Sequence, residues 1–269
     1  MELKGKRVLV TGASSGIGAA IALELAEAGA ILGLCARRTN LLEQVLAECR
    51  QSSPESIAWT VDLADLGGID RFARRAESDL GGVDVLVNNA GLVRTTRLPG
   101  ADWALIEELN RTNYLSPVKL TLALLPAMLE RGDADVLTVS SVGARLAPPA
   151  ESAYAASKAA LSAFFESAAA DLWDSGVRFH LLYPGLIHVS DEPFDADHAR
   201  LHTGMEGLPA SAVAAVARRQ LEEGAFEAYI PEQFQGMFAK RAADVAANIA
   251  FTADWAKRQF GDAYAQGDG

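Results

Sequence analysis

Short apolar segments alternate with longer amphipathic segments along the whole chain. Several of the short segments, such as RVLVT and VDVLV, are almost continuously apolar, which is typical of strands covered on both faces of a sheet. This pattern predicts seven strands, over Lys6–Thr11, Ala30–Ala36, Ser56–Val61, Val83–Val87, Asp135–Val139, Val177–Tyr183 and Glu227–Ile230.

The longer segments repeat apolar residues at the spacing of a helix, as Ile17, Ile21 and Leu25 do in the first of them. Helices are predicted over Gly16–Ala28, Thr39–Arg50, Asp65–Leu80, Asp102–Glu130, Ser152–Asp174 and Pro209–Glu223. Alternation of strands and helices indicates βαβ units with right-handed crossovers. We therefore expect one α/β domain over residues 1–269, a doubly wound parallel sheet (Rossmann-type) of about seven strands with helices on both faces.

Two segments fall outside this alternation. Ser190–Leu208 is rich in Asp, His and Gly, and we expect it to form a substrate lid that contains a short helix. A C-terminal extension, about 232–260, contains one predicted amphipathic helix over Phe234–Phe260. Its apolar face is expected to pack on the domain or on another subunit, and a role in covering the substrate is the alternative.

Composition and charge exclude several classes of partner. The 269 residues include 24 Lys and Arg against 35 Asp and Glu, which gives a net charge of −11. Such an acidic surface argues against nucleic acid and anionic membranes as partners, because both bind mainly Lys and Arg. No apolar stretch approaches the ~18 residues of a membrane span, and the first residues leave no room for a signal peptide. Cys35 and Cys49 are expected to be reduced thiols of a cytoplasmic protein.

A glycine-rich segment follows the first predicted strand. It reads TGASSGIG, from Thr11 to Gly18, and lies where that strand ends and a helix begins. Open α/β sheets bind ligands at this place. Gly12 permits a tight turn, while Gly16 and Gly18 let a phosphate approach the backbone at a helix N-terminus that offers N–H groups. The segment predicts a dinucleotide site.

The end of the second predicted strand bears on which dinucleotide binds. A site that prefers NAD usually has an acid here, which accepts hydrogen bonds from the ribose and repels a 2′-phosphate. Ala36 takes that position, and Arg37 and Arg38 follow. Because a planar guanidinium suits a phosphate dianion, the sequence favours NADP(H) over NAD(H), with Arg37 as the main contact. The alternative is that both arginines are solvated.

A tyrosine and a lysine four residues apart are the third signal. Tyr154 and Lys158 share one face of a predicted helix, so the ammonium group can lie near the phenol. A nearby cation lowers the pKa of a tyrosine, whose ordinary value of about 10 is too high for proton transfer at neutral pH. The pair predicts a general acid/base that exchanges a proton with an alcohol or carbonyl oxygen.

The order and spacing of these motifs resemble the short-chain dehydrogenase/reductase family. The resemblance covers about residues 4 to 231, and the glycine spacing is similar to the compact soluble branch, not to the epimerases and dehydratases. The motifs that carry it are TGASSGIG, the run Asn88–Gly91, Asn113, Ser141, the Tyr154–Lys158 pair and Pro184–Gly185.

The resemblance implies a role for each matched residue. Tyr154 would be the general acid/base, and Lys158 would bind the nicotinamide ribose and lower the pKa of Tyr154. Ser141 would polarise the substrate carbonyl, and Asn113 would hold a water that relays protons to Lys158. The residues implied to bind the cofactor are Gly12, Ser14, Ser15, Gly16, Ile17, Gly18, Arg37, Arg38, Asp62, Leu63, Asn89, Ala90, Gly91, Tyr154, Lys158, Pro184, Gly185 and Ile187.

Two positions depart from the family pattern. Val189 stands where the family often has a threonine that contacts the nicotinamide carboxamide. Many NADP-dependent members also carry a basic residue within the glycine loop, where this chain has Ser14 and Ser15. The NADP(H) prediction therefore depends on Arg37 and Arg38.

Together these features predict an NADP(H)-dependent oxidoreductase that moves hydride between nicotinamide and a small ketone or secondary alcohol. The alternative is a dinucleotide-binding regulatory protein without turnover, although such proteins typically lose the Tyr or the Lys. No metal is expected, because His198 and His202 lack a third ligand. The resemblance further implies a homodimer or homotetramer, formed through the helices predicted over Asp102–Glu130 and Ser152–Asp174.

Overall fold

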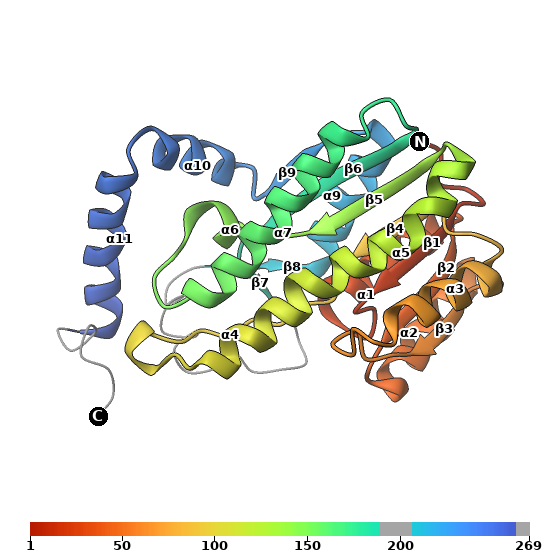
Figure 1. Cartoon of the computed structure of the whole chain (residues 1–269), viewed down its shortest axis with the longest axis horizontal. Helices are drawn as coiled ribbons and strands as arrows, with labels where there is room; N and C mark the ends of the chain where they lie inside the picture. The colour runs from red at the N-terminus through yellow and green to blue at the C-terminus, as the bar shows by residue number, and fades with distance from the viewer. Residues whose placement is uncertain (189–205, 262–269) are drawn as a thin grey trace.

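The apolar segments form a seven-stranded parallel sheet in the order β3-β2-β1-β4-β5-β6-β9 (Figure 1). The structure is a computed structural model and describes residues 1–188 and 206–261. The strands are β1 (Arg7–Thr11), β2 (Ile31–Ala36), β3 (Ile57–Thr60), β4 (Val85–Asn88), β5 (Ala134–Val139), β6 (Val177–Pro184) and β9 (Glu227–Ile230). Each predicted strand is present, and the doubly wound fold is confirmed.

Helices cover both faces of the sheet. One face carries α1 (Gly16–Glu27), α2 (Thr39–Ser52) and α9 (Ala210–Glu223), and the other carries α3 (Ile69–Leu80), α5 (Ser116–Arg131) and α7 (Ser152–Asp171). Each face has its own buried core. Because successive side chains of a strand point to opposite faces, Val8 and Val10 of β1 join the α1 core, whereas Leu9 joins the α3 core.

The order of the strands indicates where the ligand-binding crevice lies. The chain moves outward from β1 to β2 and β3, and then returns to the other side of β1 through β4. Parallel sheets bind ligands at the carboxyl ends of the strands where this reversal occurs. The site is therefore expected at the ends of β1 and β4.

Two predicted helices are interrupted. The segment predicted as one helix over Asp102–Glu130 forms α4 (Trp103–Asn110) and α5, joined by a π-helical turn, η2 (Arg111–Leu115). The prediction of one helix over Phe234–Phe260 is wrong, since the chain forms α10 (Gln233–Ala243) and α11 (Val245–Phe260). The break occurs at Asp244, whose side chain accepts a hydrogen bond of 2.9 Å from Ala247 N–H and so caps α11.

Smaller differences also have local causes. The helix predicted to begin at Asp65 begins at Ile69, because the Asp65 side chain accepts a hydrogen bond from Gly67 N–H and forms a turn. The short elements α6 (Gly143–Leu146), η1 (Leu98–Gly100), β7 (Ile187–His188) and β8 (Leu208–Pro209) were not predicted. Most of the predicted lid, Ser190–Leu208, lies outside the described residues, and so do His198 and His202.

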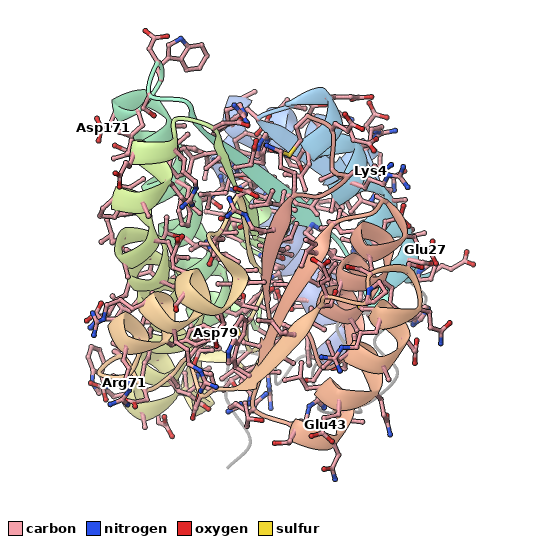
Figure 2. All side chains as sticks on the ribbon, turned by 90° about the vertical axis from the view of Figure 1, so that its right-hand side faces the viewer. Lys4, Glu27, Glu43, Arg71, Asp79 and Asp171 are labelled. Carbon is pink, nitrogen blue, oxygen red and sulfur yellow. The ribbon has the colours of Figure 1, made fainter. Side chains whose placement is uncertain are left out.

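The charged residues lie mainly on the outer faces of the helices. Figure 2 shows this for Glu27, Glu43, Arg71, Asp79 and Asp171, and it shows Lys4 exposed in the turn before β1. Within the described part of the chain, no helix is long and apolar enough to cross a membrane. The helices α10 and α11 lie beyond the carboxyl ends of the strands, on the side of the expected site (Figure 1).

Candidate active site

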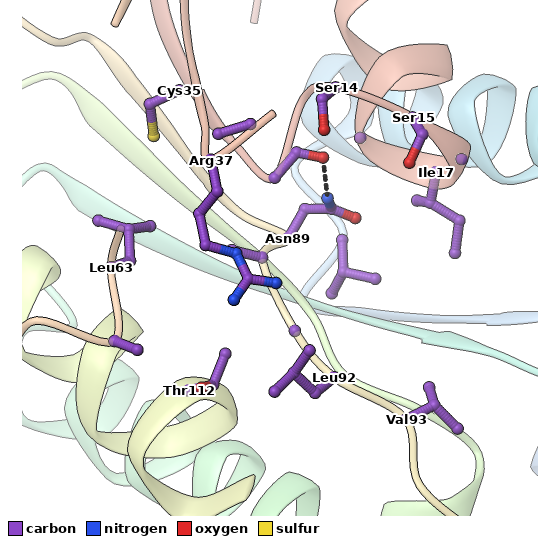
Figure 3. Close-up of a pocket in the computed structure, with 18 of the residues that line it drawn as sticks. Ser14, Ser15, Ile17, Cys35, Arg37, Leu63, Asn89, Leu92, Val93 and Thr112 are labelled. Carbon is purple, nitrogen blue, oxygen red and sulfur yellow. Dashed lines mark hydrogen bonds between the residues drawn. The ribbon is translucent and has the colours of Figure 1, made fainter. Parts of the chain in front are cut away.

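A cavity of about 530 Å³ opens at the carboxyl ends of β1, β2 and β4 (Figure 3). It extends from the glycine-rich segment to the Tyr154–Lys158 pair, a shape that suits an extended dinucleotide. The predicted cofactor residues that line it are Gly12, Ser14, Ser15, Gly16, Ile17, Gly18, Arg37, Arg38, Asp62, Leu63, Asn89, Ala90, Gly91, Tyr154 and Lys158.

The glycine turn brings the N-terminus of α1 against the ends of β1 and β4. Gly12 has a positive φ of 66°, and a Cβ there would lie 2.8 Å from the Ala90 Cα. A Cβ on Gly18 would lie 2.4 Å from both the Asn89 Nδ2 and the Gly12 oxygen. The N-cap residue Ser15 makes no side-chain hydrogen bond to the first turn of α1. The N–H groups of that turn are therefore directed at the cavity, which fits a pyrophosphate.

Thr11 and Asn89 hold this turn in place. The Thr11 hydroxyl accepts hydrogen bonds from the N–H groups of Asn89 (2.9 Å) and Ala90 (3.0 Å). In return, the Asn89 side chain donates to the carbonyl oxygens of Thr11 (2.9 Å) and Gly12 (3.3 Å). These bonds join the carboxyl ends of β1 and β4, so the glycine turn is fixed before any ligand binds.

The two arginines after β2 have different surroundings. The exposed Arg37 side chain projects into the cavity (Figure 3). Arg38 turns toward the glycine turn, where its Nε donates to the Ser14 hydroxyl (3.3 Å) and its Nη2 to the Ser15 hydroxyl. The serines that replace a basic residue in the glycine loop thus have a guanidinium beside them, supplied by the next strand.

Tyr154 and Lys158 line the far end of the cavity, and Ser141 lies beside Tyr154. Tyr154 and Lys158 lie on α7 and are both buried. Ser141 follows β5, and its Oγ accepts a hydrogen bond of 3.0 Å from Gly143 N–H. The Lys158 Nζ donates to the Val139 carbonyl oxygen at 2.9 Å. This bond orients the ammonium group along the end of β5.

Burial controls the ionisation of both α7 residues. It raises the pKa of Tyr154; the hydrogen bond with Ser141 acts in the opposite direction, and the nearby charge of Glu151 adds to the increase. Burial lowers the pKa of Lys158 to about 8. Burial has the largest effect, so the pKa of Tyr154 is raised in the described chain, and its lowering by Lys158 stays a prediction.

Asn113 lies in the π-helical turn between α4 and α5. Its Oδ1 accepts a hydrogen bond of 2.7 Å from Leu92 N–H, and its Nδ2 donates to the Leu92 carbonyl (2.9 Å) and the Ser157 hydroxyl (3.1 Å). A Cβ on Gly91 would lie 3.2 Å from Asn113 Oδ1 and 3.4 Å from Lys158 Nζ. Asn113 therefore positions the loop after β4 beside Lys158, and its role in holding a water stays a prediction.

Several predicted residues do not line this cavity, namely Asn113, Ser141, Pro184, Gly185 and Ile187. Gly185 lies under the Phe234 ring of α10, and a Cβ there would be 2.5 Å from the ring. Other lining residues were not predicted from the sequence, among them Cys35, Val61, Leu92, Thr112, Val139 and Ser140. Most of them adjoin a predicted residue. They could have been predicted from their positions at the ends of β2, β3, β4 and β5, where parallel sheets bind ligands.

The Arg145 side chain is held by contacts with other side chains of the protein. Its Nη2 donates to Glu166 and, at 2.7 Å, to the Tyr183 hydroxyl. Its guanidinium also lies 4.9 Å from the centre of the Tyr183 ring and 5.2 Å from that of Phe238. These contacts tie the α6 turn to β6 and to α10, so Arg145 is engaged in holding the C-terminal helices.

Comparison with known proteins agrees with this geometry. The family model for short chain dehydrogenase matches residues 6–193. A short chain dehydrogenase of Pseudocercospora fijiensis is 39% identical over 188 residues, which are 69% of this chain and 61% of that protein. The chain thus spans about three fifths of the length of this curated relative.

Two solved structures share the fold. A short-chain dehydrogenase from Streptomyces avermitilis has a TM-score of 0.80 and 29% identity, over 95% of this chain and 99% of that one. A short chain dehydrogenase/reductase from Burkholderia phymatum in complex with NAD has a TM-score of 0.83 and 24% identity, over 91% of this chain and 95% of that one. The expected cytoplasmic location and the oligomeric state stay predictions. The chain belongs to the short chain dehydrogenase family.

Proposed function

We propose that the protein is an NADP(H)-dependent oxidoreductase that interconverts ketones and secondary alcohols. The observation that carries this proposal is that Tyr154, which is hydrogen-bonded to Ser141, lines one end of a cavity together with Lys158, while a glycine turn and a helix N-terminus form the other end. A cavity that extends between these two groups of residues fits a dinucleotide, and Tyr154 and Lys158 would lie at its nicotinamide end.

The bound cofactor would supply or accept the hydride. In reduction, Tyr154 donates its phenol proton to the substrate oxygen, and the raised pKa of Tyr154 keeps that proton in place until it is needed. The Ser141 Oγ accepts from Gly143 N–H, so the Ser141 hydroxyl can donate to the same oxygen. Lys158, held by the Val139 carbonyl, supplies positive charge beside the phenol as it loses its proton.

The preference for NADP(H) follows from the surroundings of β2. This strand ends in the buried Ala36, so the position that would repel a 2′-phosphate holds no carboxylate. Arg37 projects into the cavity and would bind the phosphate, while Arg38 adds positive charge at Ser14 and Ser15. NAD(H) is the alternative, since the Burkholderia phymatum protein was solved with NAD.

We also propose that the protein forms a homodimer or homotetramer. Leu115, Leu122 and Leu129 recur at every seventh position, and they are 43%, 52% and 38% exposed. Residues at this spacing lie along one side of a helix, so η2 and α5 carry an exposed apolar stripe. Covering that stripe with a second copy removes apolar surface from water.

The test is a panel of ketones and alcohols with NADPH and NADP⁺, followed by the absorbance of the reduced nicotinamide, for the wild type and Tyr154→Phe. The variant should lose at least ~100-fold in kcat, with cofactor affinity little changed. Cofactor binding without turnover of any compound would favour the alternative, a regulatory protein that binds the dinucleotide. Normal turnover by a folded Tyr154→Phe protein would exclude the assigned role of Tyr154.

A further inference from the structure

The loop after β4 carries a charged side chain into the wall of the main cavity. Arg94 is exposed and lines this cavity beside Leu92 and Val93, which Figure 3 shows on the same loop. Gly91 begins the loop, and a Cβ there would lie 3.4 Å from Lys158 Nζ. Arg94 follows Gly91 by three residues, so their Cα atoms are at most about 11 Å apart. Arg94 therefore lies toward the catalytic end of the cavity.

The backbone is held on both sides of Arg94. On one side, the Asn113 amide accepts a hydrogen bond of 2.7 Å from Leu92 N–H and donates one of 2.9 Å to the Leu92 carbonyl. On the other side, Thr96 N–H donates to the Ala150 carbonyl at 2.7 Å. These bonds fix the loop at both ends, so little conformational entropy is lost when a ligand binds to Arg94.

The Arg94 guanidinium has donors left for a ligand. Its Nη1 donates to the neighbouring Val93 carbonyl at 2.9 Å. A guanidinium carries about five N–H donors, so this one bond leaves most of them unused. Among the described residues, no carboxylate forms an ion pair with Arg94. Arg145 differs in this respect, because it is paired with Glu166 and lies beside two aromatic rings.

The charged residues that line the main cavity form two groups. Arg37 and Arg38 follow β2 and Asp62 follows β3, at the end where the 2′-phosphate of NADP(H) is expected. Arg94 and Lys158 are the charged lining residues at the other end, and Lys158 is buried. Once the cofactor fills the first end, Arg94 is the exposed cation that a substrate meets among the described lining residues.

The carboxylates in this part of the described chain leave the charge of Arg94 in place. Glu151 is 6% exposed, lines neither of the two cavities and has a partner of its own. Glu206 lines the second cavity, of about 290 Å³, together with Phe234 of α10. Arg97, on the same loop as Arg94, is a further cation, buried with its guanidinium 5.9 Å from the centre of the Phe260 ring. The loop after β4 therefore suits an anionic group better than a cationic one.

We propose that Arg94 binds an oxyanion group of the substrate, a carboxylate or a phosphate, and so selects anionic carbonyl compounds. The proposal deepens the reductase function proposed above and rests on it. A guanidinium holds either group through two parallel N–H···O bonds, which orient the substrate as well as bind it. The oxyanion takes no part in the bonds that form or break, because hydride still passes to the carbonyl carbon and the proton still comes from Tyr154.

Aryl ketones with rigidly placed charges test the proposal. Phenylglyoxylate, meta-acetylbenzoate and para-acetylbenzoate hold a carboxylate at increasing distances from the ketone, and the methyl ester of each is its uncharged partner. The acetylphenyl phosphates, compared with the acetylphenols, test the phosphate. Binding is measured by calorimetry with saturating NADP⁺ or NAD⁺, which fills the cofactor end and permits no reduction. At least one charged compound should bind ~10-fold or more tightly than its uncharged partner.

Three variants identify the residue responsible. Arg94→Gln should remove the preference for the charged compound and leave binding of its uncharged partner unchanged. Arg94→Lys should keep part of the preference, because an ammonium retains the charge but lacks the planar fork of donors. The matched control is Arg71→Gln, the same change at an exposed residue of α3 (Figure 2), which should keep the wild-type preference.

The outcomes separate the two proposals. Equal binding of every charged compound and its uncharged partner by the wild type overturns the role of Arg94, even if Arg94→Gln fails to fold. A preference that a folded Arg94→Gln protein retains also overturns it. A preference confined to carboxylates or to phosphates supports the role and identifies the group. The expected preference without reduction of any ketone by NADPH or NADH overturns the reductase function and leaves anion binding by Arg94 intact.

Discussion

The side-chain amide of Asn113 hydrogen-bonds both backbone groups of Leu92, accepting from its N–H at 2.7 Å and donating to its carbonyl at 2.9 Å. This pairing joins the π-helical turn before α5 to the loop after β4. Asn113 is fully buried, so its amide depends on these partners and on the Ser157 hydroxyl for its hydrogen bonds.

Asn113→Ala should therefore lower the free energy of unfolding by about 2–3 kcal/mol, because it removes three hydrogen bonds at once, two to the backbone of Leu92 and one to the Ser157 hydroxyl. Asn113→Asp should be at least as harmful, since it turns a carboxylate oxygen toward the Leu92 carbonyl. Chemical denaturation provides the measurement. Asn110→Ala, one turn earlier, is the control, because Asn110 is half-buried and donates only to Ile106. Equal losses at both positions would contradict the special role of Asn113.

Lys158 should make the free energy of unfolding depend on pH. Its pKa is about 8 in the folded chain and about 10.4 when unfolded. Below pH 8 both states carry the charge, and its burial costs about 3 kcal/mol. Between the two pKa values the unfolded chain binds more protons, so stability rises with pH and the cost disappears.

Lys158→Met should consequently raise the free energy of unfolding at pH 7 by about 2 kcal/mol, after allowance for the lost hydrogen bond to Val139. The advantage should shrink as the pH rises toward 10. Thermal melts across this range would measure it, and Lys240→Met, at an exposed position of α10, should show no such trend. A pH-independent difference would mean that the ammonium is not destabilised by burial.

Arg37→Ala should weaken NADPH binding by roughly 30- to 150-fold, the equivalent of about 2–3 kcal/mol for one charged hydrogen-bond partner, and should leave NADH binding unchanged. Ala36→Asp combined with Arg37→Ala should shift the preference toward NADH through added repulsion. Fluorescence titration with both reduced cofactors measures this. Equal affinities of the wild type for NADPH and NADH would refute the assignment.

Arg38→Ala should behave differently, because Arg38 contacts the glycine turn through Ser14 and Ser15. Its loss should weaken the binding of both cofactors by a similar factor, since the turn faces the pyrophosphate that they share. The same titrations apply. A loss confined to NADPH would mean that Arg38 binds the 2′-phosphate itself.

A charged residue within the exposed apolar stripe of η2 and α5 should prevent self-association. Wild-type protein should scatter light as a multiple of 28.5 kDa, and Leu122→Glu should shift the mass toward the single chain. Ala47→Glu, on an exposed position of α2, is the control and should keep the wild-type mass. A wild type that scatters as a single chain at micromolar concentration would disprove self-association through this face.

Local sequence patterns predicted the strands and the ends at which ligands bind, because strand periodicity and glycine turns depend on neighbouring residues. Tyr154 and Lys158 were found for the same reason, since they lie one helical turn apart. Arg38 beside Ser14 and Glu151 beside Ser141 depend on how separate segments pack, which no local pattern records. The helix break at Asp244 was partly predictable from the sequence. Aspartate favours helix N-caps, but the apolar stripe continues past Asp244 and indicated one unbroken helix.

The position of Arg145 between Tyr183 and Phe238 limits how this protein can be re-engineered. The Arg145 guanidinium links the turn after Ser141 to α10. The C-terminal helices therefore cannot be replaced without changing the contacts of that turn. A chimaera that takes its C-terminal segment from another protein would need an aromatic side chain at position 238 to restore the contact between Arg145 and α10. Libraries aimed at new substrates should therefore hold Phe238 constant and vary the residues around it.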